Sequence, residues 1–339
     1  MLEGLVETGY VPDFITRLGA RYMLGLKTKD LTYPTSAEQD AAKRDYILNL
    51  KTAKIALNTE EANEQHYELP TRFFQLCLGK RLKYSSSLFE RGAKNLDEAE
   101  EHMLELYCER AQLEDGLTVL DLGCGWGSLS LYLAEKYPNS QITGLSNSST
   151  QREFIMDRAD QLGLKNLTII TADMNEFQTD RVFDRVMSIE MFEHMKNYYQ
   201  LFEKVSKWVK PDTGRMFVHV FAHKSMPYDF TSNSGWMGKY FFTGGTMPCQ
   251  DLFMWFQEDL QVLDRWTVSG SNYEKTSNEW LRLMDENKAE IMDIFTKTYG
   301  KDANVWFQRW RMFYLGVAEV FGYNGGNDWV VMHYLFKRK

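Results

Sequence analysis

The spacing of apolar residues changes along the chain and divides it into three regions. In residues 1–110 apolar side chains recur every three or four positions, which is the period of a helix with one buried face. The pattern is clearest in residues 2–23, 40–57 and 97–113. We therefore expect the first region to form an N-terminal helical cap.

From residue 118 onward, short apolar runs alternate with helical segments. Five runs have the length and composition of buried strands, and they span residues 118–122, 141–145, 167–170, 183–188 and 215–220. Helical spacing lies between them, most clearly at 128–136, 151–162 and 198–209. This alternation predicts an α/β core over residues 111–225, with a parallel sheet and right-handed crossovers.

The alternation loosens in the third region, residues 226–339. A long segment rich in Trp and Phe, 277–321, predicts helices, whereas 260–269 and 329–336 predict two further strands. Gly244–Pro248 has the composition of a loop. We expect the two strands to complete a seven-stranded, mostly parallel sheet. The helices of the first and third regions should lie over its carboxyl edge as a lid, where the third region forms the substrate pocket.

The overall composition limits the classes of protein that fit this chain. Hydrophobic residues make up 44% and charged residues 25%, and the net charge of −8 disfavours nucleic acid and anionic membranes as partners. The four cysteines form no CxxC pair and no zinc-spaced cluster, so we expect reduced thiols and no metal site. No apolar stretch of about 18 residues and no signal-peptide pattern occurs. We therefore expect a cytoplasmic protein without stable membrane insertion, and a homodimer is left open.

A glycine-rich turn joins the first predicted strand to the next helix. It reads Asp121-Leu122-Gly123-Cys124-Gly125-Trp126-Gly127, and glycine lets the backbone approach a ligand where a Cβ atom would clash. The GxGxG spacing is neither the dinucleotide pattern nor the phosphate-binding loop. Asp121 would repel a pyrophosphate but suits the ammonium group of S-adenosylmethionine, at the strand end where open α/β sheets bind ligands. Glycines that only permit a tight turn are the alternative.

The chain resembles a known family in this turn and in three further segments. Residues 119–130, VLDLGCGWGSLS, resemble the nucleotide-binding loop of class I S-adenosylmethionine methyltransferases. Residues 105–112, 188–198 and 240–248 are similar to plant coclaurine-type N-methyltransferases, which make benzylisoquinoline and related alkaloids. That group is itself similar to bacterial cyclopropane fatty acid synthases. The resemblance covers roughly residues 65 to 339, and it implies a class I methyltransferase fold and a small amine substrate.

The resemblance also implies which residues contact S-adenosylmethionine. They are Tyr84 and Ser85 before the core, Gly123 and Gly125 in the turn, Asn147 and Gln151 after the second strand, and Asp173 after the third. Many class I methyltransferases have an acid at the end of the second strand for the ribose hydroxyls, but this chain has Gly144-Leu145-Ser146-Asn147. Asn147 or Gln151 would have to supply those hydrogen bonds, unless Gln151 is an ordinary first-turn helix residue.

Two carboxylates and a histidine follow the fourth predicted strand. If the chain turns helical there, Glu190, Glu193 and His194 occupy positions i, i+3 and i+4 and share one face. Paired carboxylates would hold a cation, and the histidine could accept a proton near neutral pH. An aliphatic amine with a pKa of about 10 is protonated at pH 7, and its deprotonation costs roughly 3–4 kcal/mol. These three residues are the predicted catalytic group for N-methylation, and a solvated helix start with ordinary acids is the alternative.

Two other functions are compatible with the sequence. A lipid enzyme of the cyclopropane-synthase type would need a bicarbonate-like base site; the chain keeps Glu193, His219 and the segment around Trp310-Arg311, but it has Ser86 where that family has a cysteine. The second alternative function is a scaffold protein that binds the cofactor without catalysing a reaction. The glycine turn together with the acid–base residues favours an amine methyltransferase over both. Aromatic residues near the C-terminus predict a pocket wall for an arylalkylamine, and they include Trp306, Trp310, Tyr314, Phe321 and Tyr323.

Overall fold

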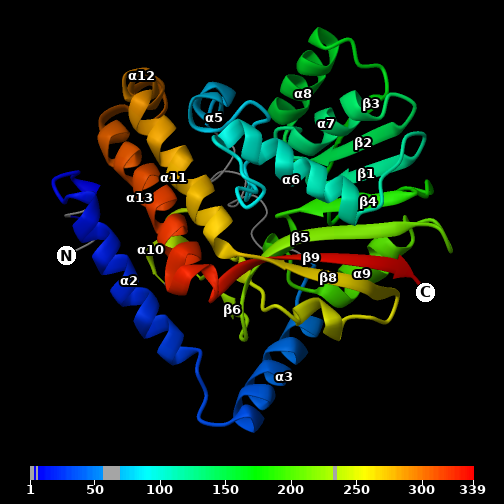
Figure 1. Cartoon of the computed structure of the whole chain (residues 1–339), viewed down its shortest axis with the longest axis horizontal. Helices are drawn as coiled ribbons and strands as arrows, with labels where there is room; N and C mark the ends of the chain where they lie inside the picture. The colour runs from blue at the N-terminus through cyan, green and yellow to red at the C-terminus, as the bar shows by residue number, and fades with distance from the viewer. Residues whose placement is uncertain (1–3, 5–6, 56–68, 232–234) are drawn as a thin grey trace.

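A seven-stranded sheet forms the centre of the molecule (Figure 1). The computed structural model describes residues 4, 7–55, 69–231 and 235–339. The strand order is β3-β2-β1-β4-β5-β9-β8, in which the first five strands are parallel, β9 is antiparallel to β5, and β8 is antiparallel to β9. This confirms the predicted fold. The strands are β1 (Thr118–Leu122), β2 (Gln141–Ser146), β3 (Leu167–Thr171), β4 (Arg185–Ile189), β5 (Arg215–His223), β8 (Leu260–Val268) and β9 (Trp329–Arg338).

Apolar side chains cover both faces of the sheet, which is why its strands read as continuous apolar runs. Successive residues of a strand point to opposite faces, so Met187 belongs to one buried cluster and Val186 to the other. The first cluster includes side chains of α6 (Leu96–Arg110), α7 (Ser128–Lys136) and α8 (Ser149–Gln161). The second includes side chains of α3 (Ser36–Thr52), α9 (Tyr198–Ser206) and the 3-10 turn η2 (Leu252–Trp255).

A layer of helices lies beyond the carboxyl ends of the parallel strands (Figure 1). Helix α13 is central to this layer, because α2, α11 and α12 all pack on it. Arg17 and Arg21 of α2 both pair with Glu319 of α13, at 2.7 and 2.5 Å. The layer consists of α2 (Asp13–Asp30), α10 (Trp236–Tyr240), α11 (Gly270–Glu286), α12 (Lys288–Tyr299) and α13 (Ala303–Gly322), with α5 (Thr71–Cys77) packed against α11.

Several elements differ from the expected ones. Within the expected N-terminal cap, α3 and α6 lie against the faces of the sheet and not over its edge. The predicted loop at 244–248 contains β7 (Thr246–Met247), which pairs with β6 (Tyr228–Asp229) in a two-stranded ribbon. The fourth strand begins at Arg185, because Phe183 forms an isolated bridge with Val209.

The aromatic C-terminal segment is divided among α11, α12 and α13. Asn287 separates the first two helices, and Gly300, with a φ of +56°, begins the turn η3 (Gly300–Asp302) before the third. A further turn, η4 (Tyr323–Gly326), leads into β9. The predicted helical positions Leu2, Leu5 and Val6, and residues 56–57, lie outside the described residues. In the described part of the chain, no helix is long and apolar enough to cross a membrane.

Candidate active site

The glycine turn after β1 contains two glycines that face side chains and one that faces open space. Gly123, Gly125 and Gly127 have φ values of +75°, +51° and +79°, a backbone region that favours glycine. A Cβ atom at Gly123 would lie 2.7 Å from Cγ of Met191, and one at Gly127 would lie 2.6 Å from Cγ1 of Ile155. A Cβ atom at Gly125 would meet nothing within 4 Å. Gly125 therefore borders a free volume beside the turn.

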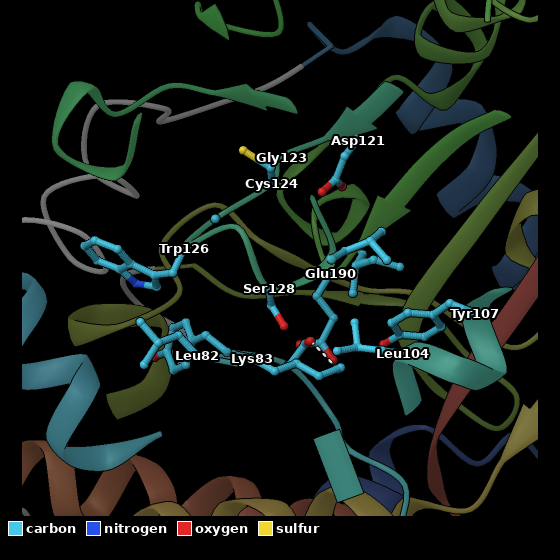
Figure 2. A pocket seen from close by; sticks show the side chains of 15 residues that line it. Leu82, Lys83, Leu104, Tyr107, Asp121, Gly123, Cys124, Trp126, Ser128 and Glu190 are labelled. Atoms are coloured by element: carbon cyan, nitrogen blue, oxygen red, sulfur yellow. Dashed lines mark hydrogen bonds between the residues drawn. The ribbon is translucent and has the colours of Figure 1, made fainter. Parts of the chain in front are cut away.

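This free volume is a cavity that extends to the end of β4 (Figure 2). Its wall includes the glycine turn, the segment 82–85, Leu104 and Tyr107 of α6, and Glu190. Of the predicted cofactor residues, Tyr84, Ser85, Asp121, Gly123 and Gly125 line it. The others follow the carboxyl ends of β2 and β3, the next strands beyond β1, and they are Asn147, Gln151 and Asp173.

Polar atoms around this cavity are buried without a hydrogen-bond partner among the described residues. They include Oγ of Ser128 and Nε1 of Trp126 in the wall, and Nε2 of Gln151 on α8. A buried polar atom left unpaired costs about 1–3 kcal/mol. A ligand with carboxylate and hydroxyl groups would satisfy these atoms, so the residues present fit S-adenosylmethionine.

Asp121 is the acidic residue of the turn and is almost fully buried. Its Oδ2 accepts a hydrogen bond from Oγ of Ser130 at 2.6 Å. Burial raises the pKa of the Asp121 carboxyl to about 6, because the charged form loses its hydration. A bound ammonium group would favour the ionised carboxylate, as expected for the methionine end of the cofactor.

The segment that carries Tyr84 and Ser85 is held by one buried carboxylate. Glu100 of α6 accepts hydrogen bonds from the backbone N–H groups of Gly79, Arg81 and Lys83, at 3.1, 2.8 and 3.3 Å. Burial raises the pKa of Glu100 to about 7. Glu100 therefore fixes the backbone of the cavity wall from behind.

Lys83 is a cation in the cavity wall that the sequence analysis missed. Its Nζ donates to Oγ of Ser85 at 2.6 Å and to the carbonyl of Ser86 at 2.5 Å, and it lies 5.2 Å from the centroid of the Tyr107 ring. Burial lowers the pKa of Lys83 to about 8, although Glu190 and Glu100 oppose this effect. The signal in the sequence was weak, because a lysine beside a loop is normally a solvated surface residue.

Glu190 directly follows β4 and has a left-handed backbone conformation, with a φ of +49°. Its Oε1 accepts from the N–H of Ser86 at 2.9 Å and lies 2.9 Å from Nε2 of His219, and its Oε2 accepts from the hydroxyl of Tyr273 at 2.7 Å. In Figure 2 its side chain lies between Ser128 and Tyr107. Burial raises the pKa of Glu190, and Lys83 together with these donors opposes the rise. The helix that would have placed Glu190, Glu193 and His194 on one face does not form, since Phe192–His194 forms only a 3-10 turn, η1.

Glu193 and His194 lie on that turn and have different surroundings. Glu193 is fully buried; its Oε1 accepts from the N–H of Phe221 at 2.8 Å, and its Oε2 has no partner among the described residues. Burial, and then the charge of Glu190, raise the pKa of Glu193 well above its usual range. His194 packs edge-on against Phe242, and burial lowers the pKa of its imidazole to about 4. His194 is therefore neutral at pH 7.

A second cavity, of about 540 Å³, opens beside the first and is mainly apolar. Glu190 and His194 line it, together with aromatic residues of β5, α10, α11 and α13. Tyr84 and Glu190 belong to the walls of both cavities. The charged side chains of Lys27 and Asp229 also line the second cavity. The structure thus brings Glu190 and His194 to one space, whereas Glu193 lines neither cavity.

Only some of the C-terminal aromatic residues that were predicted to form the pocket wall line this cavity. Phe321 lines it, whereas Trp310 and Tyr314 are buried in the core of the helical layer. Trp306 stacks on Tyr299, with ring centroids 4.7 Å apart. Aromatic residues missed by the sequence analysis contribute instead, among them Phe221, Phe230, Trp236, Phe242 and Phe313.

Comparison with known proteins identifies the family. The family model for mycolic acid cyclopropane synthetase matches residues 56–324. (S)-Coclaurine N-methyltransferase of Thalictrum flavum subsp. glaucum is 39% identical over 98% of this chain and 94% of its own length. Pavine N-methyltransferase of the same plant is 36% identical over 98% and 95%. This chain belongs to the coclaurine-type N-methyltransferases. It is an S-adenosylmethionine-dependent methyltransferase within the wider cyclopropane synthetase family.

One solved structure is similar to almost the whole chain, and a bacterial lipid enzyme is similar to three quarters of it. A coclaurine N-methyltransferase bound to N-methylheliamine and SAH has a TM-score of 0.96 and 36% identity, covering 99% of this chain and 98% of that one. Cyclopropane-fatty-acyl-phospholipid synthase of Escherichia coli strain K12 is 30% identical over 75% of this chain and 63% of its own length. S-adenosylmethionine is the cofactor of the family, and the first cavity contains residues suited to it.

Replacing Gly125 tests the assignment of the cofactor cavity. Gly125→Val places a branched side chain in the open space beside the turn, so we expect S-adenosylmethionine binding to be lost while the fold is kept. Isothermal titration calorimetry and circular dichroism measure the two effects. Gly163→Val is the matched control, because Gly163 also has a positive φ, +70°, and open space, but lies after α8. Wild-type cofactor affinity in a folded Gly125→Val variant would contradict the assignment.

Replacing Glu100 tests the support of the segment 79–85. Glu100→Gln exchanges one acceptor oxygen for an N–H₂ group that faces backbone N–H groups. We expect a loss of roughly 1–3 kcal/mol in the free energy of unfolding and weaker cofactor binding. Chemical denaturation and calorimetry measure both. Glu101→Gln, at a half-exposed neighbour that pairs with Arg81, is the control and should change cofactor affinity little. Equal effects of the two substitutions would show that Glu100 has no special role.

Proposed function

We propose that this enzyme transfers the methyl group of S-adenosylmethionine to the nitrogen of a small arylalkylamine of the tetrahydroisoquinoline type. The observation that carries the proposal is that Glu190 belongs to the walls of both the cofactor cavity and the apolar cavity. A carboxylate at that junction would hold an ammonium group beside the cofactor. The named activities of the coclaurine and pavine N-methyltransferases, and the N-methylheliamine bound to the related structure, support the same substrate class.

The apolar cavity suits an aromatic amine. Its volume of about 540 Å³ lies within the usual range for small-molecule sites. Aromatic rings on its wall favour flat apolar groups and attract a cation over their faces. Lys27 and Asp229 provide polar groups on the cavity wall for oxygen substituents of the substrate.

The proposed chemistry begins with the protonated amine. Glu190 binds the ammonium ion, and the neutral imidazole of His194 takes its proton and passes it on to water, because an imidazole with a pKa of about 4 does not retain a proton at pH 7. Loss of this proton frees the nitrogen lone pair. When bound, S-adenosylmethionine supplies an electrophilic methyl group. Alignment of the nitrogen with that group supplies much of the remaining rate enhancement. Glu193 lies behind these residues and holds the N–H of Phe221, which positions β5 at the cavity.

The lipid alternative requires a site for a bicarbonate-like base, and in this chain other protein groups already contact the histidine of that site. Both ring nitrogens of His219 are within hydrogen-bond distance of protein groups, with Glu190 on one side and Tyr107 and His333 on the other. His219 therefore has no free nitrogen for a bicarbonate-like ion. Two assays test these functions directly. One measures methyl transfer to tetrahydroisoquinolines, and the other measures methyl transfer to phospholipid vesicles with unsaturated chains. Methylation of the lipid and not of any amine would overturn the proposal.

Removal of His194 should lower turnover more than binding. We expect His194→Ala to reduce kcat by roughly 10²–10⁴-fold at pH 7, as for other positioned bases. Because the pKa of His194 is lowered to about 4, its imidazole stays neutral from pH 6 to 9. An increase of kcat over that range therefore does not reflect titration of His194. The amine and Lys83, whose pKa is lowered to about 8, are the groups that lose a proton there. High pH should partly rescue His194→Ala, since solution then supplies the free amine.

Carboxylate variants and a histidine control complete this test. Glu190→Gln should raise KM for the amine, because the opposite charge is lost from a partly dry cavity, and Glu193→Gln should have a smaller effect. His102→Ala removes a histidine outside both cavities and should leave kcat unchanged. Cofactor affinity, measured by calorimetry, should change little in His194→Ala. Full turnover by His194→Ala at pH 7 would exclude His194 as the base.

We also propose that the chain forms a homodimer through α2. No residue of this helix is buried, and exposed apolar side chains recur every fourth position on and before it, at Tyr10, Phe14, Leu18, Tyr22 and Leu26. Helix α2 is held on α13 by Arg17 and Arg21 and lines the apolar cavity through Leu24, whereas the exposed stripe has no cover among the described residues. A second copy would cover it, because each copy presents the same stripe about a two-fold axis. Location in the cytoplasm stays a prediction.

Analytical ultracentrifugation tests the dimer. The wild-type chain should sediment with twice the monomer mass, and Leu18→Glu should sediment as a monomer. Leu48→Glu is the matched control, because Leu48 on α3 is 60% exposed and Leu18 is 59% exposed, and it should keep the wild-type mass. A wild-type monomer, with or without binding to lipid vesicles, would overturn the proposal.

A further inference from the structure

A pair of buried histidines connects the active site to the C-terminal end of α6. His219 on β5 and His333 on β9 are register partners, are both fully buried, and have ring centroids 4.9 Å apart. Nε2 of His333 lies 2.9 Å from Nδ1 of His219, and Nε2 of His219 lies 2.9 Å from Oε1 of Glu190. The two rings therefore form a continuous hydrogen-bonded chain that ends on the Glu190 carboxylate.

Arg110 lies at the other end of this chain. It is the last residue of α6, and its Nη1 lies 2.7 Å from Nδ1 of His333. The guanidinium group is also 5.0 Å from the ring of Trp266. A guanidinium group has hydrogen-bond donors only. Nδ1 of His333 must therefore be the acceptor in this contact.

This single constraint fixes the proton positions on both rings. A neutral His333 whose Nδ1 accepts carries its proton on Nε2, and that proton is donated to Nδ1 of His219. Nδ1 of His219 then has no proton, so its proton is on Nε2 and points at Oε1 of Glu190. The hydroxyl of Tyr107 is also 2.9 Å from this Nδ1, so Tyr107 and His333 share its single lone pair. Any other neutral tautomer places two donors or two lone pairs against each other.

We propose that Arg110 and His333 are positioning residues that lock the tautomer of His219 and thereby keep a hydrogen-bond donor on the Glu190 carboxylate. The effect on catalysis rests on the proposed function, in which Glu190 binds the amine. The assignment of the tautomers does not depend on that function. Protonation of either histidine would break the chain, because a doubly protonated ring donates from both nitrogens. Burial independently lowers the pKa of both imidazoles well below the usual value, in agreement with neutral rings.

The same geometry excludes a route for the substrate proton. A proton released to Glu190 and passed on to His219 would have to leave at Nδ1, which already accepts from His333 and Tyr107. Moving it further would require Arg110 to accept a proton. The chain thus orients Glu190, and the amine proton must leave by the side on which His194 lies.

Other ionisable groups lie near these residues, and their titration also contributes to the pH dependence of the enzyme. Around Glu190 they are Lys83, Glu193, His194 and Tyr273; around the histidines they are Lys83 and Tyr107. Around Arg110 they are Arg91, Glu109 and Asp264, and burial lowers the pKa of Arg110 to about 10. Arg110 therefore stays charged from pH 6 to 9, whereas Lys83, whose pKa is lowered to about 8, titrates within this range.

Nitrogen-15 NMR of histidine-labelled enzyme tests the tautomers without any substrate. The chain has six histidines, so its ring signals can be assigned by single substitutions. We expect His219 and His333 to be protonated on Nε2 alone in the wild-type enzyme. Arg110→Met should give mixed tautomers, and Arg110→Lys, which keeps a group that only donates, should restore the wild-type pattern. A proton on Nδ1 of His219 in the wild-type enzyme would overturn the proposal even if Arg110→Met does not fold.

The kinetic test separates positioning from simple support of the fold. Arg110→Met should lower kcat/KM for the amine roughly tenfold and raise the pKa of the acidic limb of its pH profile by about one unit, with cofactor affinity unchanged. In His333→Gln the amide can donate to His219 without a tautomer choice, so adding Arg110→Met should then have little further effect. A lower melting temperature with unchanged tautomers and pH profile would show a structural role only. If the tautomers shift but no amine is turned over by wild type, the proposed function fails and the positioning chain stands.

Discussion

The Glu190 carboxylate is buried where two cavities meet, and burial favours its neutral form over the charge that an ammonium group requires. Donors from three distant segments oppose this effect: Ser86 from the loop after α5, His219 from β5, and Tyr273 from α11. None of these segments is near Glu190 in the sequence, so the hydrogen bonds that favour the charged carboxylate form only when sheet, loop and helical layer are assembled. The site is therefore a product of the tertiary structure and not of a local motif.

Two neighbouring carboxylates in a dry site do not both ionise easily. The surroundings assign the charge to Glu190, because Lys83 and three donors face it, whereas Glu193 has one backbone donor and a pKa raised well above its usual range. Glu190 has a left-handed backbone, which costs about 1–2 kcal/mol, and it lines both cavities, whereas Glu193 on the turn η1 lines neither.

The sheet could be predicted because its strands are buried on both faces, and runs such as Thr118–Leu122 are therefore rich in apolar residues at consecutive positions. The glycine turn could be predicted because positive φ and close packing at Gly123 and Gly127 demand glycine. The side-chain geometry could not. The spacing of Glu190 and His194 suggested one helical face, but Glu190 has a positive φ and lies outside the short turn that carries His194. His219 and His333 each stand alone in an apolar run, and only the register of β5 with β9 makes them partners.

The strand β9 explains why the C-terminal part of the chain matters to chemistry at the end of β4. It inserts antiparallel between β5 and β8, which places His333 beside His219 and directs the preceding helix, α13, over the carboxyl edge. The cofactor cavity is built from residues 82–129 and the end of β4, whereas the apolar cavity is built mainly from α2, residues 221–247, α11 and α13. The two walls share Tyr84 and Glu190. The helical layer can therefore vary with the amine while the shared carboxylate and its fixed donors stay the same, which is what one family with several amine substrates requires.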